Sequence, residues 1–121
     1  HMDAQNLTQL ARTAARLYNC TFFITGKTDV VSDGEQTIFL DGGDPRLCRI
    51  TGGGCMLSAL CALFCCSGAS AFEAASTAGQ LWKEISEEAG KRTDQNGGGI
   101  GQFHMSLMDM TEQKIYFSAH S

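Results

Sequence analysis

The residues best suited to chemistry form one glycine-rich segment, Thr51-Gly52-Gly53-Gly54-Cys55. Three successive glycines have no Cβ atoms, so the backbone can curl closely around a ligand. An apolar helical pattern follows directly, and the free N–H groups and positive dipole end of such a helix attract an anion. We therefore expect Gly52, Gly53 and Gly54 to form an anion hole for a phosphate or a developing phosphoryl charge.

Cys55 stands at the start of that predicted helix, where a thiol commonly loses its proton more easily. A base beside an anion hole suits the deprotonation of an alcohol that attacks a phosphoryl group. The alternative is a tight glycine turn followed by a buried cysteine with no chemical role. The segment is neither a Walker A loop, which ends in Gly-Lys-Ser/Thr, nor a GxGxxG loop.

The length of 121 residues suits a single domain. The composition is that of a globular chain rather than a disordered one, since 43% of the residues are hydrophobic and 18% are charged. The net charge of −4 argues against nucleic acid or an anionic membrane as the main partner. The longest apolar stretch, Met56–Cys66, is too short to span a bilayer, so a cytoplasmic protein is expected. His1 and Met2 are interpreted as a cloning scar, which leaves residues 3–121 as the domain.

The six cysteines predict neither a zinc site nor disulfide bonds. No CxxC pair is present, and no histidine has the spacing of a zinc partner. Most of the cysteines lie in apolar runs. Apart from Cys55, we expect them to be small buried hydrophobic residues in a reducing compartment.

The first quarter of the chain predicts a helix followed by a strand. Apolar residues recur at helical spacing over Asp3–Leu17, and Asn19 offers a C-terminal stop. Cys20–Ile24 is a short run of aromatic and β-branched residues, which predicts a buried strand of the parallel type. A helix followed by such a strand indicates an α/β fold.

A β-hairpin is predicted next, with Thr28–Ser32 and Gln36–Leu40 on either side of Asp33-Gly34. Asp-Gly favours a type I′ turn, in which both central residues have positive φ. Asp29 and Asp33 could form a magnesium-binding pair, although acids of a hairpin and its turn are the simpler interpretation. A loop follows the hairpin, and Leu47–Ile50 predicts a short strand that leads into the glycine segment.

Helices are predicted over most of the remaining chain. Cys55–Cys66 is apolar on nearly every face, which predicts a helix buried in the middle of the molecule. Ser70–Gly90 predicts a long helix whose start Ser70 can cap. A glycine-rich loop is expected over Arg92–Gly101 and a last helix over Gly101–Ile115.

Two features of the long helix predict how it faces its surroundings. Trp82 is expected in the core or at an interface. Lys83 is expected to lie with the neighbouring acids on a solvated face.

The few strands available to the predicted sheet indicate a piece of a larger α/β domain, or a sheet that is completed by assembly.

Several segments resemble those of hydroxyethylthiazole kinases, which have the ribokinase-like fold. The matches are Thr25–Gly34 to TGxxDxVSDG, Gly42–Pro45 to the loop that follows it, Thr51–Ala59 to TGTGCxLSA, and, more weakly, Gly99–Phe103 to GPGSF. Their order and spacing agree from about Asp3 to Met110. The resemblance implies a partial ribokinase-like three-layer α/β/α sandwich with a β-hairpin and a buried glycine-led helix.

The same resemblance implies roles for individual residues. Cys55 would be the catalytic base, where most ribokinase-like kinases have an aspartate. Gly52, Gly53 and Gly54 would form the anion hole, with Gly52 also near the thiazole alcohol, and Thr25 would contact ATP. The family uses ATP and Mg²⁺ to phosphorylate 4-methyl-5-(2-hydroxyethyl)thiazole in thiamine biosynthesis and salvage, and it forms trimers.

The sequence also departs from the family pattern. Gly53 stands where the family usually has threonine or another small residue, and Ile100 and Gln102 replace a proline and a serine. The family's N-terminal half has no counterpart in these residues. That half supplies much of the thiazole pocket, a nucleotide-contacting arginine and the acids near magnesium, so the metal ligands stay unassigned.

Three other functions remain open from the sequence. A different ribokinase-like enzyme, such as a pyrimidine kinase, is disfavoured by cysteine at position 55. A non-catalytic nucleotide- or phosphate-binding assembly module would keep the glycine turn without a complete pocket. A thiol redox protein is disfavoured because no cysteine pair has CxxC spacing.

Overall fold

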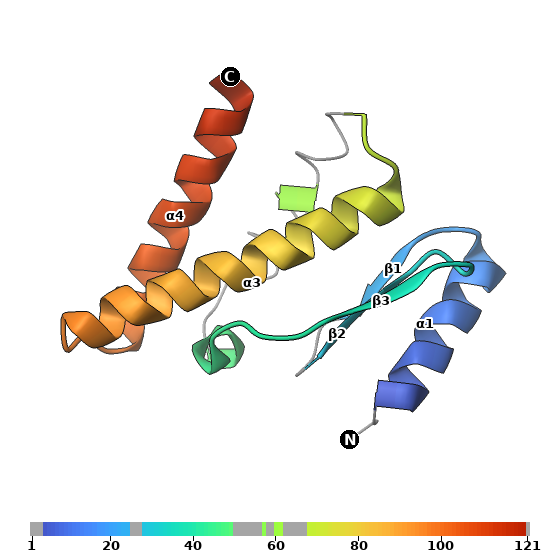
Figure 1. Ribbon diagram of the computed structural model, residues 1–121, viewed down its shortest axis with the longest axis horizontal. Helices are drawn as coiled ribbons and strands as arrows, with labels where there is room; N and C mark the ends of the chain where they lie inside the picture. The colour runs from blue at the N-terminus through green and yellow to red at the C-terminus, as the bar shows by residue number, and fades with distance from the viewer. Residues whose placement is uncertain (1–3, 25–27, 50–56, 58–59, 62–67, 121) are drawn as a thin grey trace.

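The computed structural model describes residues 4–24, 28–49, 57, 60–61 and 68–120. Three layers are present: a small sheet lies between α1 on one side and α3 on the other, and α4 packs against α3 (Figure 1). The elements in chain order are α1 (Ala4–Tyr18), β1 (Phe22–Ile24), β2 (Asp29–Ser32), β3 (Thr37–Leu40), the 3-10 helix η1 (Pro45–Arg49), α3 (Ala71–Gln95) and α4 (Ile100–His120).

Helix α1 confirms the predicted amphipathic helix and its stop. Ala11 and Ala15 are buried, and the helix contacts β1 and β2. Asn19 adopts a φ of 51°, and the N–H of Cys20 donates to the carbonyl of Ala15 at 3.1 Å, which is a left-handed helix end. The expectation that Cys20 is buried is wrong, because it lies at this exposed helix end before β1 begins.

The sheet has the order β1-β2-β3, and both pairings are antiparallel. Val31 of β2 lies opposite Phe23 on one side and Ile38 on the other. The predicted strand after the first helix is confirmed, but β1 is half-buried rather than buried and has no parallel neighbour in the described sheet. Only one of its edges is paired there, which accounts for the lower burial.

The predicted hairpin is confirmed, but its turn is not type I′. Ser32 pairs with Thr37, so the loop comprises the four residues 33–36. Within this loop only Gly34 has a positive φ, of 98°. The Asp33 carboxylate accepts the N–H groups of Glu35 and Gln36 at 2.9 and 2.7 Å, and such a side-chain acceptor stabilises a longer turn.

These hydrogen bonds predict a small acid-sensitive contribution to stability. The backbone N–H groups of Gln36 and Glu35 hold the pKa of Asp33 below its ordinary value. A lowered pKa stabilises the fold fully above the unfolded-state value, and this contribution disappears as pH falls through the lowered pKa. Asp33→Asn should therefore flatten the dependence of the melting temperature on pH below about 4. Equal slopes for both proteins would contradict this role.

Helix α3 begins as predicted and ends later. Ser70 Oγ accepts the N–H of Glu73 at 3.2 Å, which confirms the cap. The expected end at Gly90 is wrong, because the helix continues to Gln95 and the glycine loop shrinks to residues 96–99. The helix continues past Gly90 because residues 91–95 include neither glycine nor proline, the two residues that most disfavour a helix.

The main core lies where α3 and α4 meet the predicted glycine-led helix. Of that helix, residues 57, 60 and 61 are described, and all three are helical. Leu57 and Leu60 are buried, and their core cluster includes Trp82, Phe103 and Leu107. The expected burial is confirmed for Leu57, Leu60 and Trp82, whereas Cys61, also expected to be buried, is only partly buried. In the described part of the chain, no helix combines the length and the apolar character needed to cross a membrane.

The strand predicted over Leu47–Ile50 is wrong, because residues 45–49 form η1. The N–H of Leu47 donates to the carbonyl of Asp44 at 3.0 Å, and the N–H of Arg46 donates to its carboxylate at 2.9 Å. Asp44 therefore starts a tight helical turn at Pro45, where proline's fixed φ is compatible with the first helical position.

Two glycines of the helices offer a matched test of packing. A Cβ at Gly79 would overlap Leu40 Cδ1 and lie 2.8 Å from Phe23 Cε2, whereas a Cβ at Gly101 would meet nothing within 4 Å. Gly101→Ala should stabilise the protein by about 0.5–1 kcal/mol through helix propensity. Gly79→Ala should destabilise it by roughly 1 kcal/mol, because overpacking outweighs the same propensity gain. Urea unfolding measures both values, and equal stabilisation would contradict the close contact at Gly79.

Candidate functional site

The predicted site residues Thr25, Gly52, Gly53, Gly54 and Cys55 lie outside the described residues. The nearest described residues are Ile24 and Thr28 around Thr25, and Arg49 and Leu57 around the glycine segment. Thr25 follows directly after β1 and precedes β2 by a few residues. The glycine segment follows η1 and precedes the buried Leu57.

A buried ion pair joins α3 to the start of β2. Lys83 Nζ lies 3.1 Å from Asp29 Oδ2, and the two residues are only 6% and 3% exposed. The expectation that Lys83 lies on a solvated face is wrong. Gly79, Lys83, Ser86 and Gly90 recur at helical spacing and form one buried stripe of α3, which faces inward. Two carboxylates in the hairpin therefore have distinct partners, since Asp29 pairs with Lys83 and Asp33 stabilises the turn.

The loop before η1 is docked on the same stripe of α3. The N–H of Gly43 donates to Glu87 Oε1 and the N–H of Asp44 donates to Ser86 Oγ, both at 2.9 Å. Ser86 Oγ in turn donates to the carbonyl of Lys83 at 2.7 Å. Gly43 has a φ of 86°, and its missing Cβ leaves room for the aliphatic part of Lys83. Lys83 therefore contacts both the loop and β2.

A second polar cluster fixes η1. Arg46 bridges two carboxylates, Asp44 Oδ1 at 3.0 Å and Asp94 Oδ1 at 2.9 Å, and its guanidinium lies 5.3 Å from the centre of the Phe103 ring. Desolvation lowers the pKa of Arg46, but hydrogen bonding to Asp94 and the charges of both carboxylates outweigh it and raise the pKa. The Asp44 carboxylate also occupies the space that a Cβ at Gly90 would need.

One hydrogen bond links the two flanks directly. Thr28 Oγ1 donates to Asp41 Oδ1 at 2.8 Å, which joins the residue before β2 to the residue after β3. Together with the Lys83–Asp29 pair, this bond brings the end of the Thr25 segment close to the loop that leads to the glycine segment. The start of β2 and the loop before η1 are therefore held close together.

Four positioning residues do not stand out in the sequence: Asp44, Arg46, Lys83 and Ser86. A usable signal was present, because Gly79, Ser86 and Gly90 are small residues at helical spacing around Lys83. Small residues on one stripe of a long helix allow a loop to approach closely. As for metals, the part of the chain that the structure describes contains no group of three or more acidic, cysteine or histidine side chains that could hold an ion.

The ion pair predicts a large effect for a single substitution. Lys83→Ala leaves Asp29 buried without its cation, so the free energy of unfolding should fall by roughly 3–5 kcal/mol. Arg92→Ala is the control, because Arg92 forms an exposed pair with Glu88 at 3.9 Å and should change stability by less than about 0.5 kcal/mol. Urea unfolding of both variants measures the difference, and similar small effects would show that the buried pair contributes little.

Comparisons with known proteins agree on one family. A family model described as "Hydroxyethylthiazole kinase family" matches residues 1–115. A curated hydroxyethylthiazole kinase of Clostridium beijerinckii is 39% identical over 101 residues, which is 83% of this chain and 36% of the relative. One of Escherichia coli O6:K15:H31 is 32% identical over 110 residues, which is 91% of this chain and 42% of the relative.

A solved structure agrees with these relatives. The hydroxyethylthiazole kinase protein from Pyrococcus horikoshii OT3 superimposes with a TM-score of 0.65 at 31% identity, over 90% of this chain and 41% of that chain. The expected fold class, a partial ribokinase-like α/β/α arrangement with a hairpin, is thereby confirmed. The chain spans about two fifths of the length of the relatives that it matches.

Proposed function

This chain belongs to the hydroxyethylthiazole kinase family, and from that premise we propose that it takes part in the ATP-dependent phosphorylation of 4-methyl-5-(2-hydroxyethyl)thiazole. The observation that carries the proposal is the family match over residues 1–115, which includes the TGGGC segment. The product would be the phosphate ester of the thiazole alcohol, an intermediate on the route to thiamine. Because this chain covers only 36% and 42% of the two relatives, the activity of the whole family protein is a proposal for it.

Cys55 is the proposed base of the reaction. The thiolate takes the proton of the substrate hydroxyl, whose oxygen then forms a bond to the γ-phosphorus of ATP. The bond from that phosphorus to the bridging oxygen breaks, and ADP leaves with the electron pair. The backbone N–H groups of Gly52, Gly53 and Gly54 stabilise the negative charge on the transferred phosphoryl group. Thr25 contacts the nucleotide, and Gly52 lies beside the alcohol.

The described residues before and after the glycine segment are fixed by packing and hydrogen bonds, which supports this assignment. On the far side of the glycine segment, Leu57 and Leu60 are fixed in the core. On the near side, Asp44 and Arg46 fix η1 on α3. Fixed neighbours before and after the glycine segment favour the proposed anion hole, because preorganised dipoles are a major source of phosphoryl-transfer catalysis.

Magnesium, assembly and location belong to the same proposal. Mg²⁺ would neutralise the phosphates of ATP, but the described residues include no cluster of metal ligands, so we assign none. A homotrimer follows from the family resemblance. A cytoplasmic location is consistent with the use of ATP.

Turnover of the purified 121-residue chain tests the proposed function. With Mg-ATP and the thiazole alcohol, formation of thiazole phosphate that depends on both substrates would mean that this chain builds a complete site, whereas no product would mean that the site needs the family's N-terminal half. Cys55→Ala should lower kcat by about 100-fold or more, because removal of a general base commonly has an effect of that size, while nucleotide affinity stays nearly constant. Cys55→Asp should retain part of the activity, since a carboxylate can accept the same proton.

The matched control is Cys20→Ala, which removes an exposed free thiol far in sequence from the glycine segment. It should leave kcat unchanged. A chain that binds ATP without forming thiazole phosphate would contradict the kinase proposal for this chain and favour a non-catalytic nucleotide-binding module. Equal activity of Cys55→Ala and the parent chain would remove Cys55 from the mechanism.

A further inference from the structure

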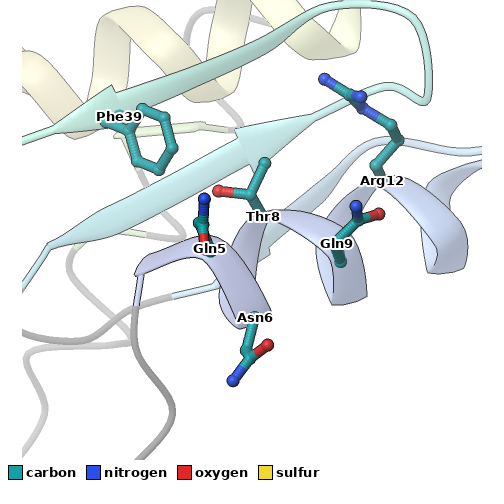
Figure 2. Close-up of a pocket in the computed structure, with 6 residues that line it drawn as sticks. All are labelled: Gln5, Asn6, Thr8, Gln9, Arg12 and Phe39. Atoms are coloured by element: carbon teal, nitrogen blue, oxygen red, sulfur yellow. The ribbon is translucent and has the colours of Figure 1, made fainter.

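The chain contains three asparagines, and Asn96 alone among them precedes a glycine. The others are Asn6, which lies in α1 (Figure 2), and Asn19, which follows that helix, and both precede residues that carry a Cβ. Asparagine is chemically labile, and a following glycine leaves its own backbone nitrogen unobstructed for attack on the side-chain amide. The pair Asn96–Gly97 is therefore the place where this backbone is best suited to react with a side chain.

The surroundings of this pair are open to water. Asn96 and Gly97 are both exposed, and a Cβ at Gly97 would meet no atom within 4 Å. Within the described residues, Asn96 forms hydrogen bonds through its backbone N–H, to the carbonyls of Arg92 and Asp94, and not through its side-chain amide. Both the amide carbon and the nitrogen that could attack it are thus accessible to solvent.

The same pair closes the C-terminal end of α3. Gly97 has a φ of 63°, and its N–H donates to the carbonyl of Asp94 at 3.2 Å. The N–H of Gly98 donates to the carbonyl of Thr93 at 2.9 Å, which completes a Schellman cap. Asn96 has a ψ of 1°, which turns the Gly97 nitrogen away from the Asn96 side chain. Attack requires rotation about the Cα–C bond of Asn96, so both hydrogen bonds must open first.

We propose that Asn96–Gly97 is a self-modification site, at which opening of the α3 cap leads to deamidation. Hydroxide removes the proton of the Gly97 N–H, and this nitrogen forms a bond to Cγ of Asn96. The bond from Cγ to the amide nitrogen breaks, and that nitrogen takes a proton from water and leaves as ammonia. Water then opens the cyclic imide. Cleavage at the main-chain carbonyl carbon leaves isoaspartate, and cleavage at Cγ leaves aspartate.

Either product opposes closure of the cap. Each adds a carboxylate at the C-terminal end of α3, where the helix dipole disfavours negative charge and Asp94 already carries one. Isoaspartate also adds a methylene to the backbone before Gly97, so the two donating N–H groups no longer match the carbonyls of the last turn. Asp94 pairs with Arg46 of η1 at 2.9 Å, so loosening of this turn extends to the place where η1 contacts the helices.

Prolonged incubation of the 121-residue chain at mildly alkaline pH tests the proposal. Mass spectrometry of its peptides measures deamidation at each asparagine, and labelling by isoaspartyl methyltransferase detects isoaspartate. We expect Asn96 to react at least about tenfold faster than Asn19, which is also exposed at a helix end. The rate should rise with pH, because the attacking nitrogen must lose its proton.

The role of the cap is tested with a blocked peptide of residues 94–99, which has no helix to close. It should deamidate at least about tenfold faster than the folded chain, because no hydrogen bonds oppose the rotation at Asn96. Hydrogen exchange at the Gly97 and Gly98 amides measures opening of the cap independently. A folded chain that reacts as fast as the peptide would overturn the role of the cap.

Two variants separate the chemistry from its consequence. Asn96→Gln keeps a neutral amide but disfavours ring closure, so it should form no isoaspartate and keep the parent's urea midpoint. Asn96→Asp adds the charge without the longer backbone and should lower the midpoint, and the isoaspartate form, isolated by ion exchange, should lower it further. Isoaspartate at Asn96 no higher than in Asn96→Gln would overturn the proposal, as would equal rates at Asn96 and Asn19.

Discussion

The ion pair between Lys83 and Asp29 is the interaction on which the packing of the hairpin against α3 depends. Removing two charges from water is unfavourable, and their attraction compensates only when the geometry is good and the remaining hydrogen-bonding groups are satisfied. At 3.1 Å and almost without exposure, the pair meets the first condition. Because a partly separated pair would be strongly unfavourable, α3 and the start of β2 have little freedom to shift relative to each other.

The same stripe of α3 carries the loop that leads to η1. Ser86 accepts an N–H of the loop, and Gly90 leaves space for the Asp44 carboxylate. Small residues at these positions let the loop approach the helix closely, while Lys83 fills the room beside Gly43. One helix thereby contacts both the start of β2, through Asp29, and the loop before η1, through Asp44.

Local signals in the sequence predicted the first helix, the hairpin, the cap at Ser70 and the burial of Trp82. These features depend on periodicity or on residues within a few positions, such as the φ of Asn19. Failures occurred where distant residues decide. Residues 47–50 look apolar and strand-like, but Ser86 of α3, 42 positions away, holds Asp44 where it starts the 3-10 turn of residues 45–49. Lys83 looks solvated until Asp29, far away in sequence, is brought beside it. The roles of Thr25 and of residues 52–55 stay predictions from the family resemblance.

The separation of Lys83 from Asp29 along the chain has a consequence during synthesis. The hairpin that contains Asp29 can form within microseconds, since its contacts are local. At about 5–20 residues per second, a ribosome needs roughly 3–10 seconds to add the residues up to Lys83. Throughout that interval the Lys83 ammonium is not available to Asp29, and α3 is not available to cover that face of the nascent sheet. The order of translation thus delays burial of that face until its cation has been made.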